Sequence, residues 1–250
     1  MATFEELKAL SNQTSVATIS DVMQSISFQS TIKGIQSVTP NKRLFGQAVT
    51  VRSLPAREDC IADINFEYKD KIASGDPMMH AIKLCGPGKV LVIETSGYKD
   101  AAIGGDTKFA ALDNLGAEGL VTDGALRDQR EFKEEFNFPS YSAGFTPLVG
   151  TGRVLYPHAV NIDISCGGCL VRSNDYIFGD EDGVIVIPAS IIEETLNNAI
   201  ASEKQGLYVR AKSIKEGITY GDIVSKPDEW MPDFLATSGL SNVQKAFFDK

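Results

Sequence analysis

Residues 104–128 read GGDTKFAALDNLGAEGLVTDGALRD, and this stretch carries both a fold signal and a chemical signal. The run from Thr107 to Leu115 reads as a helix, and Gly116 suits its C-cap because glycine adopts a left-handed backbone without steric cost. Gly119 to Thr122 then reads as a short β-prone run. An earlier apolar run, Lys89 to Thr95, is typical of a strand that is buried on both faces. Together these elements predict a mixed α/β fold.

The surrounding chain is predicted to be helical near its start and richer in strands in its second half. Helices are expected at 3–11, 16–27 and 58–85, the last broken at 75–77 by Gly75-Asp76-Pro77. Strands are expected at 47–54, 140–144, 160–164, 168–172, 176–178 and 184–187. A long helix is expected from Ser190 to Arg210, with Ser190 and Glu193 forming a capping box.

The chemical signal is a set of charged groups at the two ends of residues 104–128. Asp106 and Asp128 offer the oxygen ligands that Mg²⁺ or Mn²⁺ takes, and such a cation needs only one or two protein carboxylates. Arg127 adds a planar cation that can bind a carboxylate through two hydrogen bonds. The pair Gly104-Gly105 lets the backbone approach a ligand, and the helix N-terminus after it favours an anion. This combination predicts a pocket for a metal ion and a keto acid.

Each part of this set also has an ordinary structural explanation. A Gly-Gly pair before a helix is often a plain turn, and Asp123-Gly124 is a common turn dipeptide. The charged run from Arg127 to Glu131 is also compatible with a solvated surface. The order and spacing of the parts therefore carry the functional interpretation.

The spacing resembles a known family. Twenty residues separate Asp106 from Arg127-Asp128, and Glu131 follows after two more. This pattern is similar to that of the class II pyruvate aldolases that cleave 4-hydroxy-4-methyl-2-oxoglutarate and 4-carboxy-4-hydroxy-2-oxoadipate, which are members of the RraA-like family. Further similar segments occur in the same order, so that the resemblance spans roughly residues 15 to 210: residues 44–51, 86–93, 119–124 and 179–188.

The resemblance implies a layered α/β/β/α sandwich of the swivelling-domain type, assembled as a homotrimer or homohexamer with active sites between subunits. It places a single catalytic domain at residues 1–210. Residues 211–250 would then be a C-terminal extension that packs on the core or on a neighbouring subunit.

The resemblance also implies roles for individual residues in a divalent-metal-dependent lyase that releases pyruvate through a metal-stabilised enolate. Asp128 would bind the metal directly and Asp106 through water, while Arg127 would neutralise charge on the keto oxygen. The substrate carboxylate would be held by the backbone around Gly104, Gly105, Thr107 and Lys108. Oxaloacetate decarboxylation is expected as well, because loss of CO₂ leaves the same enolate.

Two acidic residues are assigned more loosely. Glu131 closes the signature, and we expect it to orient Arg127 or a metal-bound water. Glu203, from its position on the long C-terminal helix, is the candidate for a glutamate that the adjacent subunit contributes in these aldolases, and a plain surface role is the alternative.

A different class of function is also compatible with the resemblance. Some RraA-like proteins are non-catalytic regulators that bind a protein partner such as ribonuclease machinery. The full acidic signature favours an enzyme here, since a regulator would not need Asp106 and Glu131. The family has also been labelled a demethylmenaquinone methyltransferase, but the chain has no glycine-rich nucleotide loop after its first strand.

Composition and charge narrow the classes of function that the chain can have. The formal net charge of −9 predicts no nucleic-acid binding, because neutralising phosphates requires a basic patch. The chain start lacks the features of a signal peptide and no apolar run approaches the ~18 residues of a membrane span, so we expect a cytoplasmic protein without membrane contact. Cys166 and Cys169 have C-x-x-C spacing but are expected to be structural. His80 and His158 are expected to be structural or peripheral.

Overall fold

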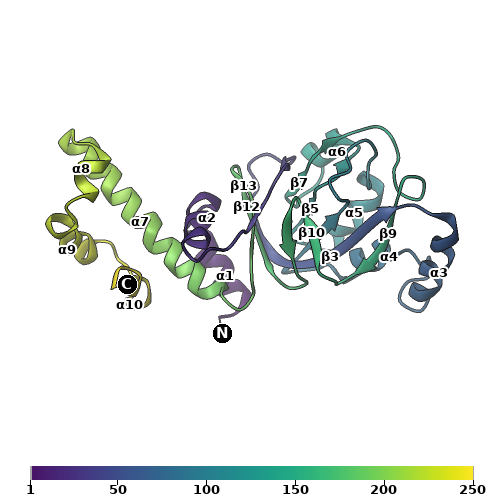
Figure 1. Cartoon of the computed structure of the whole chain (residues 1–250), viewed down its shortest axis with the longest axis horizontal. Helices are drawn as coiled ribbons and strands as arrows, with labels where there is room; N and C mark the ends of the chain where they lie inside the picture. The colour runs from purple at the N-terminus through teal and green to yellow at the C-terminus, as the bar shows by residue number, and fades with distance from the viewer. Residues whose placement is uncertain (1, 250) are drawn as a thin grey trace. The chain divides into compact units, whose positions relative to one another are not determined.

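In the computed structural model, which describes residues 2–249, the apolar run at 89–94 forms β4 (Lys89–Glu94), an interior strand of a nine-stranded sheet. The chain divides into two compact units: an α/β unit, residues 28–190, and a helical unit, residues 2–27 with 191–249. Figure 1 shows both units.

The strands of the α/β unit follow the order β1-β13-β12-β3-β4-β5-β7-β2, with β9 paired to β3. The four strands β3, β4, β5 and β7 are parallel, and the other pairings in this sheet are antiparallel. The strands in this sheet are β1 (Thr31–Ile32), β2 (Gln36–Ser37), β3 (Leu44–Pro55), β4, β5 (Gly119–Thr122), β7 (Ser140–Ser142), β9 (Leu155–Val160), β12 (Tyr176–Asp180) and β13 (Gly183–Ile187). Two small sheets pair β6 (Ala125–Leu126) with β8 (Gly144–Phe145) and β10 (Ile164–Cys166) with β11 (Cys169–Val171).

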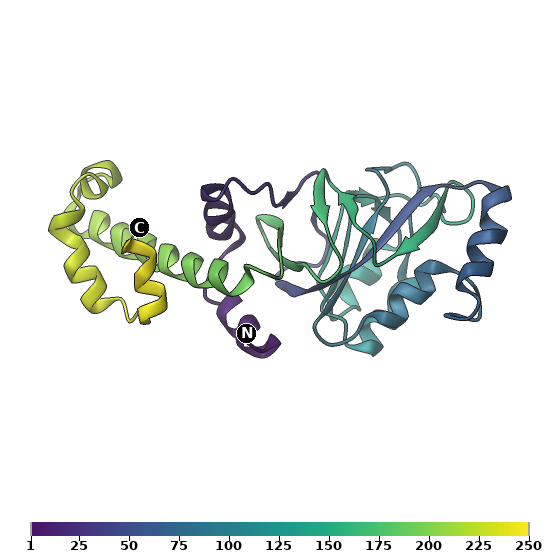
Figure 2. The ribbon, with the colours of Figure 1, turned by 60° about the horizontal axis from the view of Figure 1, so that its bottom comes forward.

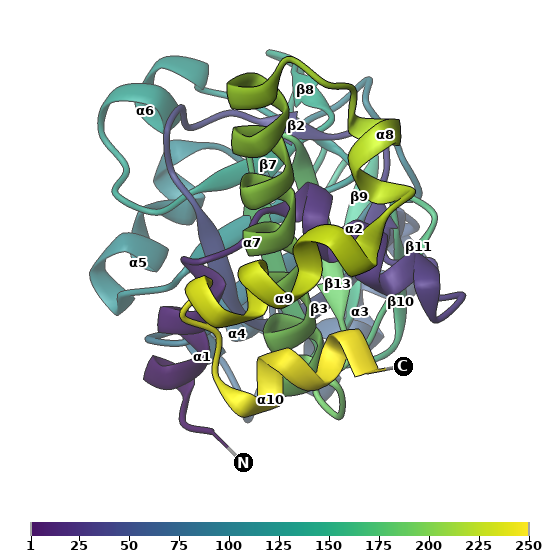
Figure 3. The same ribbon diagram turned by 90° about the vertical axis from the view of Figure 1, so that its left-hand side faces the viewer.

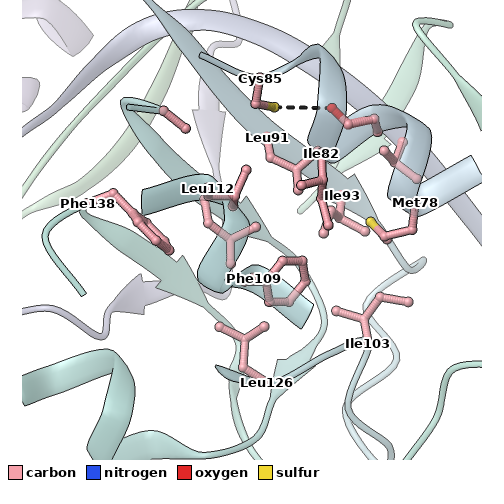
Figure 4. Close-up of a cluster of buried hydrophobic side chains, with 14 of the residues drawn as sticks. Met78, Ile82, Cys85, Leu91, Ile93, Ile103, Phe109, Leu112, Leu126 and Phe138 are labelled. Atoms are coloured by element: carbon pink, nitrogen blue, oxygen red, sulfur yellow. Dashed lines mark hydrogen bonds between the residues drawn. The ribbon is translucent and has the colours of Figure 1, made fainter. Parts of the chain in front are cut away.

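Both faces of the parallel strands are buried, as the apolar runs predict. Alternate residues point to opposite faces of a strand. Leu91 and Ile93 of β4 pack in one apolar cluster, while Val90 and Val92 pack in another that includes the β10–β11 hairpin. The first cluster is covered by helices α4 (Pro77–Leu84), α5 (Asp106–Leu115) and α6 (Gln129–Glu134). Figure 4 shows how Phe109 of α5 lies among these side chains. Helix α3 (Glu58–Tyr68) precedes α4 in this unit.

The helical unit is built around α7 (Ile192–Glu216), a helix of 25 residues. Its other elements are α1 (Phe4–Ser11), α2 (Val16–Ser25), α8 (Tyr220–Val224), α9 (Pro227–Thr237), α10 (Asn242–Lys245) and the 3₁₀ helix η1 (Ala246–Asp249). Figures 2 and 3 show α9 and α10 beside α7. Trp230 and Phe234 of α9 are buried against Val209 of α7, so the C-terminal segment has an apolar core together with this helix. Residue 210 lies within α7, and the division between catalytic domain and extension at that point stays a prediction.

Most predicted elements are present, and two differ in position. The strand expected at 160–164 is wrong, because β9 ends at Val160 and β10 begins at Ile164, with Asn161 left-handed at φ 58° between them. His158 accordingly lies in β9. The long helix has Ile191 at its N-cap with no side-chain capping bond, so the capping box at Ser190 is wrong, and the helix runs to Glu216 instead of Arg210.

Cys166 and Cys169 face each other across the β10–β11 turn and are both buried as free thiols. Gly167 and Gly168 supply the turn, with φ angles of 53° and 74° that favour glycine. Burial raises the pKa of both thiols, to about 11 for Cys169. Such thiols are poor nucleophiles, which agrees with the structural role expected for them.

The mixed α/β class is confirmed, while the α/β/β/α sandwich and the trimeric assembly stay predictions. No helix within residues 2–249 has both the length and the apolar character required to cross a membrane.

Candidate active site

The candidate site forms where two loops leave the carboxyl ends of neighbouring parallel strands. One loop follows β4 and leads through Gly104-Gly105 into α5, and the other follows β5 and leads through β6 into α6. Backbone hydrogen bonds join them, from Ile103 N to Ala125 O at 3.0 Å and from Arg127 N to Gly104 O at 3.1 Å. Ligands in open α/β sheets commonly bind at this edge. The pairing brings Asp106 next to Arg127-Asp128.

Asp128 is held in an unusual backbone conformation that directs its side chain toward α5. It is the N-cap residue of α6 with φ 64° and ψ 52°, and it makes no side-chain capping bond to its own helix. Its Oδ2 instead accepts hydrogen bonds from Asp106 N at 3.1 Å and Arg127 Nε at 3.2 Å. A left-handed aspartate costs on the order of 1 kcal/mol or more, a strain found most often at functional sites.

The fit around Gly105 shows why a glycine stands here. A Cβ atom built on Gly105 would lie 1.9 Å from Asp128 Oδ2 and 2.7 Å from Arg127 Cγ. The backbone of Gly105 is extended, at φ −139°, so the restriction comes from contact and not from the dihedral angle. Gly105 was predicted to allow a close approach of the backbone. The group that its backbone approaches in the structure is the Asp128 carboxylate.

Asp106 stands at the start of α5 and is held as a carboxylate. Its Oδ1 accepts hydrogen bonds from Thr107 N at 2.5 Å and from Thr107 Oγ1 at 3.0 Å. The bond from the Thr107 N–H is the main cause that lowers the pKa of Asp106, and the neighbouring Arg127 contributes in the same direction. In this arrangement the Thr107 N–H is already used, whereas the Lys108 N–H has no hydrogen-bond partner among the residues described. A substrate carboxylate at this helix end would meet the Lys108 N–H first.

These residues line a cavity of about 290 Å³. Its walls come from three loops: Ala102, Gly104, Gly105, Asp106, Thr107, Lys108, Arg127, Asp128, Val149 and Thr151. Arg127 and Asp128 also line a second cavity of about 370 Å³ with Gln129, Phe145, Thr146 and Pro147. The structure thus brings the seven predicted residues from 104 to 108 and 127 to 128 into one pocket.

The residues fit a hard divalent cation better than a soft one. Asp106 and Asp128 each keep one carboxylate oxygen free of protein hydrogen bonds within residues 2–249. No group of three or more His, Cys, Asp or Glu side chains suited to a metal occurs in this described part. A tetrahedral zinc site needs about four such ligands, but Mg²⁺ or Mn²⁺ completes its shell with water and substrate. Two carboxylates in an open pocket match the ligand needs of Mg²⁺ or Mn²⁺.

Two predicted residues lie outside this pocket. Glu131 is in the first turn of α6 and lines neither cavity, and its carboxylate makes no ion pair or hydrogen bond with Arg127 in the described chain. Glu203 belongs to the helical unit, where its Oε2 accepts hydrogen bonds from Ser15 Oγ at 3.3 Å and from Thr18 Oγ1. The roles proposed for both glutamates stay predictions.

Asp123 supports the site through hydrogen bonds, a role that the turn dipeptide Asp123-Gly124 did not indicate. It is 4% exposed, and its carboxylate accepts four hydrogen bonds, from Thr95 N and Oγ1, Gly97 N and Gly167 N, at 2.7–3.3 Å. It therefore ties the loop after β4 and the β10–β11 turn to the strand end that leads to Arg127. A buried apolar strand followed by Asp-Gly is the sequence signal that could have indicated this role. Val149 and Thr151 carried no comparable signal.

The pattern of loops and acidic residues corresponds to a known family. The profile of the RraA-like family, described as Aldolase/RraA, matches residues 16–186. The chain belongs to the RraA-like family. The matched range contains every residue that lines the 290 Å³ cavity.

Individual relatives agree with this assignment to the RraA-like family. A protein of Halalkalibacterium halodurans named "Putative 4-hydroxy-4-methyl-2-oxoglutarate aldolase" is 39% identical over 131 residues, which cover 52% of this chain and 61% of that protein. Protein DlpA of Legionella pneumophila is 28% identical over 85% of this chain, but the match covers 32% of DlpA. This chain therefore spans less than two thirds of either relative.

A solved structure of an RraA-like protein has a similar fold. RraAS2 of Streptomyces coelicolor, described as an unusual member of the RNase ES inhibitor RraA protein family, matches with a TM-score of 0.70 and 25% identity. The match covers 82% of this chain and 96% of RraAS2. The mixed α/β class and the family predicted from the sequence are thereby confirmed.

Proposed function

We propose that this protein is a divalent-metal-dependent lyase that cleaves a 4-hydroxy-2-keto acid into pyruvate and a second carbonyl compound, and that it also decarboxylates oxaloacetate. The observation that carries this proposal is the pocket in which Arg127, Asp128 and Asp106 meet over Gly105. The name of the Halalkalibacterium relative supports the same reaction class.

Asp128 and Asp106 would hold the cation, Mg²⁺ or Mn²⁺. When bound, such an ion supplies Lewis-acid stabilisation for negative charge that develops on a keto oxygen. Because the pKa of Asp106 is lowered, this carboxylate stays charged throughout the neutral range and is available for that purpose.

Arg127 has two tasks in the proposed reaction. Its Nε donates to Asp128 Oδ2, which fixes the guanidinium against the pocket wall. The side chain remains 39% exposed, so the other guanidinium N–H groups are accessible to a substrate. During cleavage, the C3–C4 bond breaks and its electron pair moves toward the keto group, giving the enolate of pyruvate. A fixed guanidinium stabilises that charge more than it stabilises the neutral ketone, which is the requirement for catalysis.

The backbone at the start of α5 would hold the substrate carboxylate. The Lys108 N–H has no protein partner among the described residues, and it lies at the positive end of a ten-residue helix. For the lyase reaction, the proton of the 4-hydroxyl must also be removed as the C4 carbonyl forms. For oxaloacetate, the same bond cleavage releases CO₂ and needs no such base.

The proposal is tested by measuring pyruvate released from oxaloacetate in the presence of Mg²⁺, with the spontaneous rate in buffer and Mg²⁺ subtracted. Arg127→Ala and Asp128→Ala are each expected to lower the enzymatic rate by at least about 100-fold, the usual effect of removing a group that stabilises transition-state charge. Arg130→Ala is the matched control, because Arg130 is exposed and pairs with Glu134. Unchanged activity in Arg127→Ala or Asp128→Ala would rule out the mechanism.

A second candidate function follows from the similarity to RraAS2, whose family is described by inhibition of an RNase. A protein that acts only by binding ribonuclease machinery would not depend on the arrangement of Asp106, Arg127 and Asp128 in the pocket. Ribonuclease inhibition that survives in Asp128→Ala, in a protein without pyruvate release, would favour this alternative.

A further inference from the structure

The 370 Å³ cavity adjoins the pocket that contains the two aspartates, because Arg127 and Asp128 line both cavities. In a lyase of the proposed type, the carboxylate and keto group of the substrate occupy the 290 Å³ cavity. The atoms beyond C4 then extend away from this keto end of the substrate. The wall that the two cavities share leads from one to the other, so the 370 Å³ cavity is close enough to take those atoms.

The wall of the 370 Å³ cavity has one cation, and that cation already has a carboxylate partner. Apart from Arg127 and Asp128, the lining residues are all uncharged: Gln129, Phe145, Thr146 and Pro147. Arg127 Nε lies 3.2 Å from Asp128 Oδ2, so the charges of these two side chains offset each other. A substrate carboxylate placed here would lose hydration without gaining a cation of its own, and Asp128 would repel it.

Phe145 forms a fixed apolar part of this wall. It belongs to β8, where it pairs with Leu126 of β6. The centroid of its ring lies 6.1 Å from that of Phe132, and the side chain packs against the apolar cluster that α5 and α6 cover. Phe145 is only partly buried by these contacts, and it also lines the cavity. A side chain that the core already holds in place loses little conformational entropy when a ligand packs against it.

The chain that follows Phe145 keeps this apolar character. Pro147 lines the 370 Å³ cavity, Val149 lines the 290 Å³ cavity, and Leu148 between them is 55% exposed. Residues 145–149 therefore contribute side chains to both cavities, and none of these residues is charged. A substrate that lies across the two cavities would meet charged groups at its keto end and uncharged groups at its other end.

We propose that Phe145 and Pro147 form a specificity subsite for the substituent on C4 of the substrate, and that this subsite favours an uncharged, apolar group. The inference rests on the proposed lyase function and narrows the second product to an apolar aldehyde or ketone. In that cleavage, the electron pair of the C3–C4 bond gives the pyruvate enolate, which takes up a proton. The 4-hydroxyl loses its proton as C4 becomes the carbonyl carbon of the second product. The selection is one of degree, so substrates with a second carboxylate are cleaved more slowly.

The experiment compares the binding of 2-oxopentanoate with that of 2-oxoglutarate, in which a carboxylate replaces the terminal methyl group. Neither acid has a 4-hydroxyl group, so neither is cleaved. Isothermal titration calorimetry of the full chain with Mg²⁺ gives both dissociation constants. The wild type should bind 2-oxopentanoate about tenfold more tightly, the order of effect that one methyl or methylene group has in an apolar pocket.

Three variants locate the subsite. Pro147→Lys adds a cation at an exposed position of the cavity wall, and it should reduce the preference for 2-oxopentanoate by about fivefold or more. Leu148→Lys is the matched control, because it adds the same charge at a residue that lines neither cavity, and it should leave the preference unchanged. Phe145→Ala should weaken the binding of 2-oxopentanoate more than that of 2-oxoglutarate. Circular dichroism of each variant separates these effects from loss of the fold.

Wild-type protein that binds 2-oxoglutarate as tightly as 2-oxopentanoate, or binds neither acid, would overturn the proposal. An unchanged preference in Pro147→Lys would overturn it as well, because the cavity would then not hold this end of the ligand. Failure of the lyase proposal is recognised separately: the wild type would show no Mg²⁺-dependent pyruvate release from oxaloacetate, while the binding preference and its response to Pro147→Lys would persist.

Discussion

Gly105→Ala is a sharp test of the active-site geometry, because the substitution adds a single methyl group at the contact between α5 and Asp128. The new Cβ would lie 1.9 Å from Asp128 Oδ2, whereas an ordinary contact needs at least about 3.4 Å. Asp128 must therefore move by about 1.5 Å or rotate away. Its hydrogen bonds from Asp106 N and Arg127 Nε cannot both survive that movement.

The expected result is a large loss of activity with a small loss of stability. A misplacement of about 1 Å typically costs about 100-fold in rate, equivalent to about 2.7 kcal/mol of transition-state free energy. The Arg127 and Asp128 side chains are 39% and 27% exposed, so they can shift toward solvent, and the free energy of unfolding should fall by no more than about 2 kcal/mol.

Pyruvate release coupled to lactate dehydrogenase measures the activity, and urea denaturation measures the stability. Gly86→Ala is the control, because a Cβ there would lie 3.6 Å from the nearest atom, an ordinary contact. If Gly105→Ala kept its kcat/KM within threefold of the wild type, the proposed arrangement of Asp128 would be wrong.

Three further predictions concern the fold and its titratable groups. Asp123→Asn should lower the free energy of unfolding by about 2–4 kcal/mol in urea denaturation, since an amide N–H₂ would face backbone N–H donors, and an effect below about 1 kcal/mol would contradict the network. In the native protein, Ellman's reagent should modify Cys60 rapidly and the buried cysteines slowly, and rapid reaction of all four would show that the C-x-x-C hairpin is open. Tyr208 donates a hydrogen bond to Asp233, which raises its pKa to about 12, so the stability this bond contributes is present below pH 10 and lost as the pH rises toward 12. Absorbance at 295 nm should show this late titration in the wild type and an earlier one in Asp233→Asn; identical curves would refute it.

The local pattern of the sequence was sufficient for the elements that are buried on both faces or end in glycine. The strand β4 follows from its continuous apolar run, and α5 ends at Gly116, whose φ of 70° is the left-handed C-cap that glycine allows. These features depend on neighbouring residues only, so a single sequence reveals them.

Features that depend on tertiary contacts were missed. Pro157 lies within β9 opposite Ser53, at the point where the register between β9 and β3 shifts. A proline in a β-prone segment argues against a strand unless it lies at a bulge or a sheet edge. The turn that follows uses Asn161 in a left-handed conformation, which asparagine adopts more readily than most residues, but the alternating apolar residues from 160 to 164 favoured a strand. The strand was therefore predicted too late in the chain.

The candidate site was predictable in composition but not in geometry. The spacing of Asp106 and Arg127-Asp128 indicated the groups, yet the left-handed backbone of Asp128 and the close approach of its carboxylate to Gly105 are visible only in the structure.

The central claim is that a divalent cation held by Asp128 and Asp106 enables cleavage to pyruvate. The most direct test is pyruvate release from 4-hydroxy-2-oxoglutarate by protein freed of metal with a chelator, before and after Mg²⁺ is added back. We predict no release from the metal-free protein and restored release with Mg²⁺. Equal rates with and without the chelator, or no release under either condition, would contradict the claim.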